Sequence, residues 1–291
     1  MTTSDGTISW RQLLLETAAI AGRREARWLC EEASGAFGPE FDDSFDRPAG
    51  ERAVAHLDAM LARVRAGEPL QYVLGHWSFR RLDLMVDRRV LIPRPETEMV
   101  AEVAIGLARS LVGTAAALPL TLVDLGTGSG AIGLSLAAEL PRDSATVWLT
   151  DVSLDALDVA RANLAGLGAA GASVRFGHGS WFEALATELR GEVALVVSNP
   201  PYIAATDPAL EASVRDWEPA LALFAADEGL AHLRTVAHGA VEWLVPGGWL
   251  VLEIGYRQGP AVAALLEEQG LSAVEVRTDL AGHDRIAVAQ K

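Results

Sequence analysis

The sequence predicts an α/β protein with a seven-stranded, mainly parallel sheet that follows a small all-helical N-terminal domain. Apolar residues recur at helical spacing up to about residue 67, whereas short apolar runs alternate with helical patterns from about residue 92. This alternation is typical of a mainly parallel sheet that helices cover on both faces. With 291 residues, half of them apolar, the chain is long enough for one large and one small domain.

The N-terminal elements are predicted to be helices. Apolar faces occur over residues 10–20 and 26–33, and a third, over residues 54–64, ends before Gly67. Residues 37–50 contain Gly, Pro and several Asp residues, so we predict a loop there.

Two short runs, Trp77–Leu82 and Leu84–Leu91, have the composition of strands and predict a hairpin. We therefore expect three parts. They are a helical domain at residues 1–75, a linking β-hairpin at residues 76–92 and the α/β domain at residues 93–291.

Seven segments of the α/β domain are apolar and rich in β-branched residues, as buried strands are. They are Leu120–Leu125, Thr146–Asp151, Ser173–Phe176, Val193–Ser198, Trp249–Ile254, Ala273–Arg277 and Arg285–Ala289. The main helical stretches between them are Ala131–Leu140, Leu154–Leu164, Gly229–Leu244 and Ala261–Glu268.

The first of these strands runs directly into a glycine-rich turn, Gly126-Thr127-Gly128-Ser129-Gly130. Glycine permits a tight turn and lets the backbone approach a ligand that a Cβ atom would exclude. Asp124 lies just before this turn, and Asp151 ends the next strand, where it could bind both hydroxyls of a ribose. Taken alone, the glycines could simply form a turn, and Asp151 could simply cap the N-terminus of a helix. Together, at this spacing, they predict a nucleotide-type site.

A second motif, Asn199-Pro200-Pro201-Tyr202, directly follows the strand Val193–Ser198. Proline cannot donate to a sheet, so the chain leaves the sheet in a stiff loop at the carboxyl edge, where open α/β sheets place ligands. The Asn199 side-chain oxygen and a proline-held carbonyl could accept hydrogen bonds from one planar –NH2 group, on which Tyr202 could pack. The alternative is a rigid turn that only ends a strand. We favour a loop that holds an amide or amino nitrogen.

These motifs resemble those of class I S-adenosylmethionine-dependent methyltransferases, which have a Rossmann-like sheet. In that family the D-x-G-x-G-x-G turn and the acid that ends the next strand hold the cofactor. The matching residues are Asp124, Gly126, Gly128, Gly130 and Asp151, with Thr127 and Ser129 inside the turn. The resemblance implies S-adenosylmethionine as cofactor. An Asn-Pro-Pro-Tyr loop after the fourth strand narrows it to enzymes that methylate amide or exocyclic amino nitrogens.

Further segments resemble the signature of the peptide chain release factor glutamine methyltransferases, the PrmC/HemK family. They are Glu68–Gly75, Val90–Glu98, Trp181-Phe182 and Glu218-Pro219. The family usually has an acid just before the Trp-Phe pair, where this chain has Ser180. Trp181 is implied to contact the cofactor, although a core aromatic is the alternative.

The resemblance covers nearly the whole chain. It implies methyl transfer from S-adenosylmethionine to the side-chain amide nitrogen (N5) of the glutamine in the GGQ motif of release factors. Asn199 Oδ1, which also borders the cofactor, and the Pro200 carbonyl would accept both N–H bonds of that amide, with Pro201 and Tyr202 completing the loop. Neither a nucleophilic residue nor a metal is required, and the six histidines form no convincing ligand cluster.

The composition of the chain argues against several other classes of protein. The net charge of −15 disfavours nucleic-acid binding by counterion release. No apolar stretch reaches membrane-spanning length, and residues 1–5 lack the features of a secretory signal. Cys30 is the only cysteine, so an intramolecular disulfide is impossible. We expect a cytoplasmic monomer that binds neither membrane nor nucleic acid directly.

Four alternatives stay open at this point. The same loop would serve adenine-N6 methylation of nucleic acid, or glutamine methylation of a ribosomal protein. A non-enzymatic nucleotide-binding module would leave residues 199–202 unexplained. Residues 128–133 match the dinucleotide pattern G-x-G-x-x-G, but this match starts two residues late for an oxidoreductase.

Overall fold

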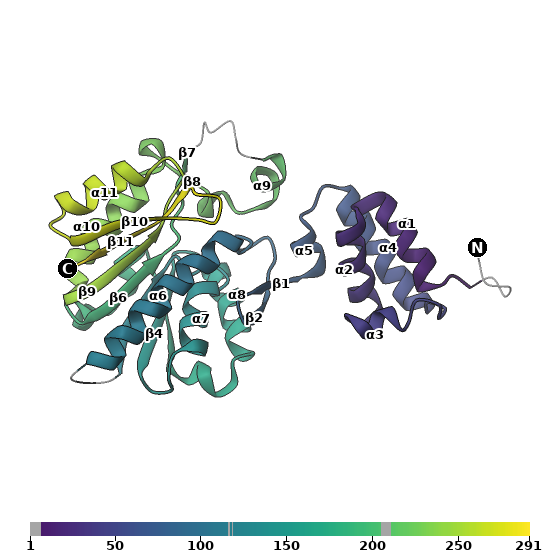
Figure 1. Cartoon of the computed structure of the whole chain (residues 1–291), viewed down its shortest axis with the longest axis horizontal. Helices are drawn as coiled ribbons and strands as arrows, with labels where there is room; N and C mark the ends of the chain where they lie inside the picture. The colour runs from purple at the N-terminus through teal and green to yellow at the C-terminus, as the bar shows by residue number, and fades with distance from the viewer. Residues whose placement is uncertain (1–6, 116, 118, 205–210) are drawn as a thin grey trace. The chain divides into compact units, whose positions relative to one another are not determined.

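The computed structural model describes residues 7–115, 117, 119–204 and 211–291 (Figure 1). Residues 1–5, in which the sequence predicts no secretory signal, lie outside the described residues. The chain divides into two compact units. The N-terminal unit comprises Met1–His76 with Ala212–Trp217, and the C-terminal unit comprises Trp77–Glu211 and Glu218–Lys291. No helix among the described residues is long and apolar enough to cross a membrane.

The N-terminal unit is helical, as predicted. Its helices are α1 (Trp10–Ala21), α2 (Arg23–Ser34), α3 (Pro39–Asp42), α4 (Glu51–Arg65), α5 (Leu70–Leu74) and α9 (Ala212–Trp217). The prediction of a loop throughout residues 37–50 was wrong, because α3 lies inside it. Pro39 stands in the first turn of α3, and Phe41 is fully buried with its ring edge-on to those of Trp10 and Phe45.

The predicted hairpin is shorter than expected. Strands β1 (His76–Phe79) and β2 (Leu82–Met85) form a two-stranded sheet, and residues 86–94 are irregular. Asn163 binds the backbone of Met85, the last residue of β2: its Oδ1 accepts from the Met85 N–H at 2.7 Å and its Nδ2 donates to the Met85 carbonyl at 3.1 Å. Asp87 and Val90 then close a turn. Four residues of this irregular segment, Arg89, Val90, Leu91 and Pro93, line a pocket described below.

The C-terminal unit contains a seven-stranded sheet in the order β10-β11-β9-β6-β3-β4-β5. Its strands are β3 (Leu120–Leu125), β4 (Ala145–Asp151), β5 (Val174–His178), β6 (Val193–Ser198), β9 (Leu244–Glu253), β10 (Ser272–Thr278) and β11 (Asp284–Gln290). Strand β11 is the one strand of this sheet that runs opposite to the other six. Strand β3 pairs with β4 on one side and β6 on the other, and the carboxyl ends at such a switch point form a ligand crevice.

The helices of this unit cover both faces of the sheet (Figure 1). They are α6 (Pro95–Thr114), α7 (Ala131–Glu139), α8 (Leu154–Ala165), α10 (Ala231–Trp243) and α11 (Gly259–Glu268). Successive residues of β3 enter different cores: Leu122 packs with α6 and α7, and Val123 packs with α10 and α11. A parallel sheet buried on both faces explains why its strands are continuous apolar runs.

Smaller elements complete the described part of the C-terminal unit. Strands β7 (Ile203–Ala204) and β8 (Phe224–Ala225) pair in parallel. The 3-10 turns are η1 (Gly168–Ser173), η2 (Trp181–Ala184), η3 (Thr187–Leu189), η4 (Ala220–Ala222) and η5 (Asp227–Gly229).

Candidate active site

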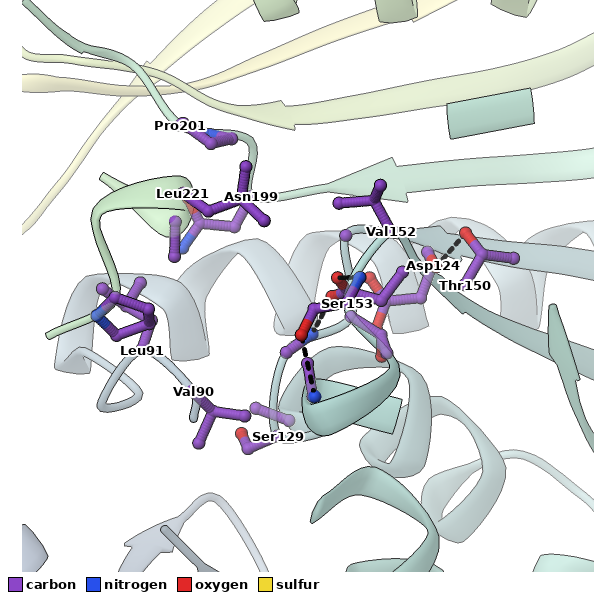
Figure 2. A pocket seen from close by; sticks show the side chains of 18 of the residues that line it. Val90, Leu91, Asp124, Ser129, Thr150, Val152, Ser153, Asn199, Pro201 and Leu221 are labelled. Carbon is purple, nitrogen blue, oxygen red and sulfur yellow. Dashed lines mark hydrogen bonds between the residues drawn. The ribbon is translucent and has the colours of Figure 1, made fainter. Parts of the chain in front are cut away.

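A pocket of about 270 Å³ lies at the carboxyl ends of β3, β4 and β6 (Figure 2). Figure 2 shows Asn199, Pro201 and Leu221 on one side of the view, and Asp124, Val152 and Ser153 on the other. The residues predicted from the sequence that line it are Asp124, Gly126, Thr127, Gly128, Ser129, Asp151, Trp181, Asn199 and Pro201. Three others, Gly130, Pro200 and Tyr202, are not part of its lining. The pocket therefore joins the glycine-rich turn to the loop after β6.

The glycine-rich turn requires glycine for two different reasons. Gly126, Gly128 and Gly130 have φ angles of 71°, 55° and 88°, in the left-handed region that favours glycine. A Cβ atom on Gly128 would meet nothing within 4 Å, so this position faces open space beside the pocket. A Cβ atom on Gly130 would lie 2.8 Å from Leu134 Cδ1, so this glycine permits close packing at the start of α7.

Asp124 is buried beneath this turn. Its Oδ2 accepts hydrogen bonds from Thr127 Oγ1 at 2.6 Å and from the Gly133 N–H at 2.9 Å, whereas the buried Oδ1 has no partner. Burial raises the pKa of Asp124 from 3.8 to about 6, against the lowering effect of those two bonds. A buried, unpaired acceptor in a pocket wall indicates a place for a hydrogen-bond donor or a positive charge on a ligand.

Asp151 is held by the backbone around the pocket. Its Oδ2 accepts from the Gly128 N–H at 3.0 Å and its Oδ1 from the Ser153 N–H at 2.9 Å. Burial raises its pKa as well. The N-cap of α8 is Ser153, whose Oγ accepts from the Ala156 N–H, so the carboxylate of Asp151 is not used as the helix cap.

Trp181 lies in the pocket wall with a φ of 49°, which is unfavourable for a bulky residue. Its ring centroid is 5.3 Å from that of His232. The neighbouring Phe182 is the core aromatic, since it is buried and its ring stacks on that of Trp243. Ser180, at the position where the resembling family has an acid, lines the pocket too.

The loop after β6 is tied to the core by hydrogen bonds. Asn199 Nδ2 donates to Thr97 Oγ1 at 3.3 Å, and Thr97 Oγ1 donates to Glu253 Oε2 at 2.7 Å. Tyr202 Oη donates to Glu253 Oε1 at 3.0 Å, so its hydroxyl is directed to the core. Pro200 is buried, and Pro201 lines the pocket. The loop is thus anchored on both sides of its two prolines.

Reasoning from the sequence did not assign roles to Thr97 and Glu253, or a physical reason to Glu218. Glu218 Oε1 accepts from Arg94 Nη2 at 2.5 Å, and Oε2 accepts from the Ile92 N–H at 3.1 Å. These bonds hold residues 90–94 and 219–222 where they form one wall of the pocket. One signal was available for Glu253: an acid inside an otherwise apolar buried run needs partners in the core.

Comparison with known proteins shows close relatives over most of the chain. The methyltransferase small domain family matches residues 108–216, and the PrmC N-terminal domain family matches residues 8–75. The release factor glutamine methyltransferase of Vibrio cholerae serotype O1 is 43% identical over 237 residues, which are 81% of this chain and 78% of the relative. That of Burkholderia pseudomallei is 42% identical over 264 residues, 90% of this chain and 89% of the relative.

A solved structure supports the same fold. The N-terminal domain of human METTL16 in complex with SAH superposes with a TM-score of 0.50 and 18% identity, and the match covers 82% of each chain. The seven-stranded sheet with one reversed strand is therefore the class I methyltransferase fold, as the sequence predicts.

Proposed function

The chain belongs to the release factor glutamine methyltransferase family, and we propose that it methylates N5 of the glutamine in the GGQ motif of peptide chain release factors. It is an enzyme that depends on S-adenosylmethionine. The observation that supports the proposal best is the pocket described above. It is lined by the glycine-rich turn and Asp151 on one side and by Asn199 on the other.

The cofactor side of the pocket fits S-adenosylmethionine, which supplies an electrophilic methyl group on a positively charged sulfonium. The buried carboxylate of Asp124 and the partly buried carboxylate of Asp151 suit a cationic ligand, and Asp124 Oδ1 still lacks a partner. We assign Asp151 to the ribose hydroxyls, and the backbone of Gly126 to Gly130, including Thr127 and Ser129, to the cradle. Trp181 would flank the cofactor, with Ser180 beside it in the wall.

We assign the binding of the substrate amide to the loop after β6, in which Asn199 lines the pocket and Pro200 lies directly beside it in the chain. The lone pair of a glutamine amide nitrogen is delocalised into its carbonyl, so this nitrogen is a weak nucleophile. Asn199 Oδ1 and the Pro200 carbonyl would accept its two N–H bonds and stabilise the positive charge that develops on nitrogen. Holding the nitrogen in line with the methyl group lowers the free-energy barrier of the transfer by roughly 7–11 kcal/mol in the best cases. The prolines keep this loop stiff, and the bond from Tyr202 to Glu253 supports a role in holding the loop.

Further parts of the proposal concern the partner and the setting. We assign residues 1–75 to docking of the release factor and residues 76–92 to a linker. We also propose that the enzyme acts as a monomer in the cytoplasm and binds no nucleic acid directly. The net charge of −15 supports the last point.

Mass spectrometry tests the proposed reaction. A purified, unmethylated release factor is incubated with this protein and S-adenosylmethionine, beside a release factor whose GGQ glutamine is replaced by alanine. One added methyl group on that glutamine, absent from the alanine variant, is the expected result. No transfer, with cofactor binding measured separately, would contradict the substrate and lead to ribosomal protein and adenine substrates.

A further inference from the structure

Asn199 is connected to the core of the C-terminal unit by a relay of two hydrogen bonds. Its Nδ2 donates to Thr97 Oγ1 in the first turn of α6, and Thr97 Oγ1 donates to Glu253 Oε2 at the end of β9. Thr97 is 4% exposed and Glu253 is 1% exposed. Water therefore has little access to either residue, and both rely on other protein groups for hydrogen bonds.

The chemistry of these groups determines which end of the Asn199 amide faces Thr97. Both oxygens of Glu253 accept hydrogen bonds, Oε2 from Thr97 Oγ1 and Oε1 from Tyr202 Oη, so the single hydroxyl proton of Thr97 is directed to Glu253. The Thr97 oxygen can then offer only a lone pair to Asn199, which must present its –NH2 group. Oδ1 is left on the other end of the planar amide, and no described residue donates to it. With the amide reversed, a substrate –NH2 group would meet another donor.

The same carboxylate also holds the far side of the loop. Glu253 Oε1 accepts from Tyr202 Oη, and Gln258 Nε2 donates to the Tyr202 carbonyl at 3.1 Å. Glu253 thus anchors the loop 199–202 at both ends. Burial raises the pKa of Glu253, and the hydrogen bonds from Thr97 and Tyr202, with the charge of Arg285, act in the opposite direction.

We propose that Thr97 and Glu253 are positioning residues for methyl transfer, which orient the Asn199 amide so that Oδ1 is the acceptor offered to the substrate nitrogen. The inference rests on the proposed function, because it takes the substrate group at Asn199 to be an amide –NH2. Neither residue is required to touch the substrate or the cofactor. Removal of either side chain should therefore lower the rate of methyl transfer by disturbing the orientation of Asn199.

Threonine 97 offers a nearly isosteric test. Thr97→Val removes the hydroxyl and Thr97→Ser keeps it, while Ser135→Ala removes another buried hydroxyl, on α7, that does not line the pocket. We expect Thr97→Val to lower kcat on the release factor by about 10- to 100-fold, as a misplaced reacting group does. The affinity for S-adenosylmethionine, measured by calorimetry, should change less than about threefold, because the lesion leaves the cofactor side intact. Thr97→Ser and Ser135→Ala should stay within about threefold of the wild type in both measurements.

A double-mutant cycle shows whether Thr97 acts through Asn199. In an Asn199→Ala background, Thr97→Val should cause no further loss of kcat, because there is no amide left to orient. Glu253→Gln keeps the shape of the side chain but adds a donor where Thr97 and Tyr202 both donate. It should reproduce the loss of kcat in a protein that still binds the cofactor and unfolds cooperatively.

The outcomes separate this inference from the proposed function. A wild-type protein that transfers no methyl group to any release factor would contradict the proposed function itself. An active wild type with a fully active Thr97→Val variant would contradict only the relay. Equal losses of cofactor affinity and kcat, or fully additive effects in the cycle, would also overturn it, since they indicate general damage to the fold.

Discussion

Arg94 and Glu218 are 124 positions apart in the sequence, yet Arg94 Nη2 donates to Glu218 Oε1 at 2.5 Å. The Glu218 side chain is 1% exposed and that of Arg94 is 32% exposed. Since Glu218 also binds the Ile92 N–H, this carboxylate connects the segment before α6 to the segment that carries Pro219 and Leu221. One wall of the pocket therefore depends on one ion pair.

Glu218→Ala should lower the free energy of unfolding by about 1–3 kcal/mol, because it leaves a backbone N–H and a partly buried guanidinium without their acceptor. Urea denaturation measures this change. The matched control is Glu242→Ala, which removes the exposed pair with Arg190, where both side chains are 55% exposed. That variant should change the free energy of unfolding by less than about 1 kcal/mol. Equal changes in the free energy of unfolding for the two substitutions would show that the buried pair stabilises the fold no more than the exposed one.

Asn199→Ala should reduce methyl transfer to the release factor to a small residual rate, while the affinity for S-adenosylmethionine stays within a few-fold of the wild type. The physical reason is that the substitution removes the acceptor proposed for the substrate amide but leaves Asp124, the glycine-rich turn and Asp151 in place. Calorimetry and a transfer assay on the same preparation measure both quantities. If transfer and cofactor affinity fell together, the role assigned to Asn199 would be wrong.

Two glycines of the turn should respond differently to alanine. Gly130→Ala should lower the free energy of unfolding by about 2–4 kcal/mol, since a left-handed residue costs about 1–2 kcal/mol and the contact with Leu134 adds to it. Gly128→Ala adds a methyl group in open space beside the pocket, so only the backbone cost applies, and cofactor affinity should fall. Thermal melting together with cofactor titration separates the two effects. A larger loss of stability in Gly128→Ala would contradict this assignment.

Asp124 should make the free energy of unfolding depend on pH. Its pKa is about 6 in the folded protein against an ordinary value of 3.8, so the unfolded chain loses this proton first as pH rises. The contribution of Asp124 to the free energy of unfolding is therefore fully present below about pH 4. Between pH 4 and 6 it falls by about 3 kcal/mol in total, and above pH 6 it no longer changes. The difference between the wild type and Asp124→Asn, followed by urea denaturation from pH 4 to 8, isolates this residue. A difference that does not change across that window would contradict the prediction.

The same ionisation should favour the cationic cofactor. The affinity of the wild type for S-adenosylmethionine should rise as pH increases through about 6, because the binding site gains a negative charge. Calorimetry at pH 5 and pH 7.5 measures this change, which Asp124→Asn should diminish.

Local sequence signals were sufficient for the sheet and for the motifs at its carboxyl edge. The segments predicted for β3 and β6 match the observed strands, because each is an uninterrupted apolar run. Strand β9 is different: it begins at Leu244, whereas Trp249 was predicted as its first residue. Pro246 and Gly247 read as breakers of a strand, but Pro246 is exposed, and Leu244 already pairs with Val193.

The groups that support the motifs could not be predicted in the same way. Asn199 belongs to a recognisable four-residue motif, but its partner Thr97 is 102 positions away in the sequence. Thr97 in turn donates to Glu253, from which it is separated by 156 positions. Which side chains meet over such separations is decided by the order of the strands and by the placement of α6 on the sheet. Periodicity and spacing describe neither, so only the folded structure revealed these contacts.

The convergence of Thr97 and Tyr202 on Glu253 has a consequence for motion. Glu253 ends a central strand, so the loop 199–202 can swing outward only if hydrogen bonds of the core break with it. Its opening should therefore be as slow and as rare as fluctuations of the sheet, and hydrogen exchange of the Tyr202 amide should resemble that of β9. A substrate then meets a rigid acceptor, and any adjustment that admits the glutamine must come from the segments on the other walls of the pocket.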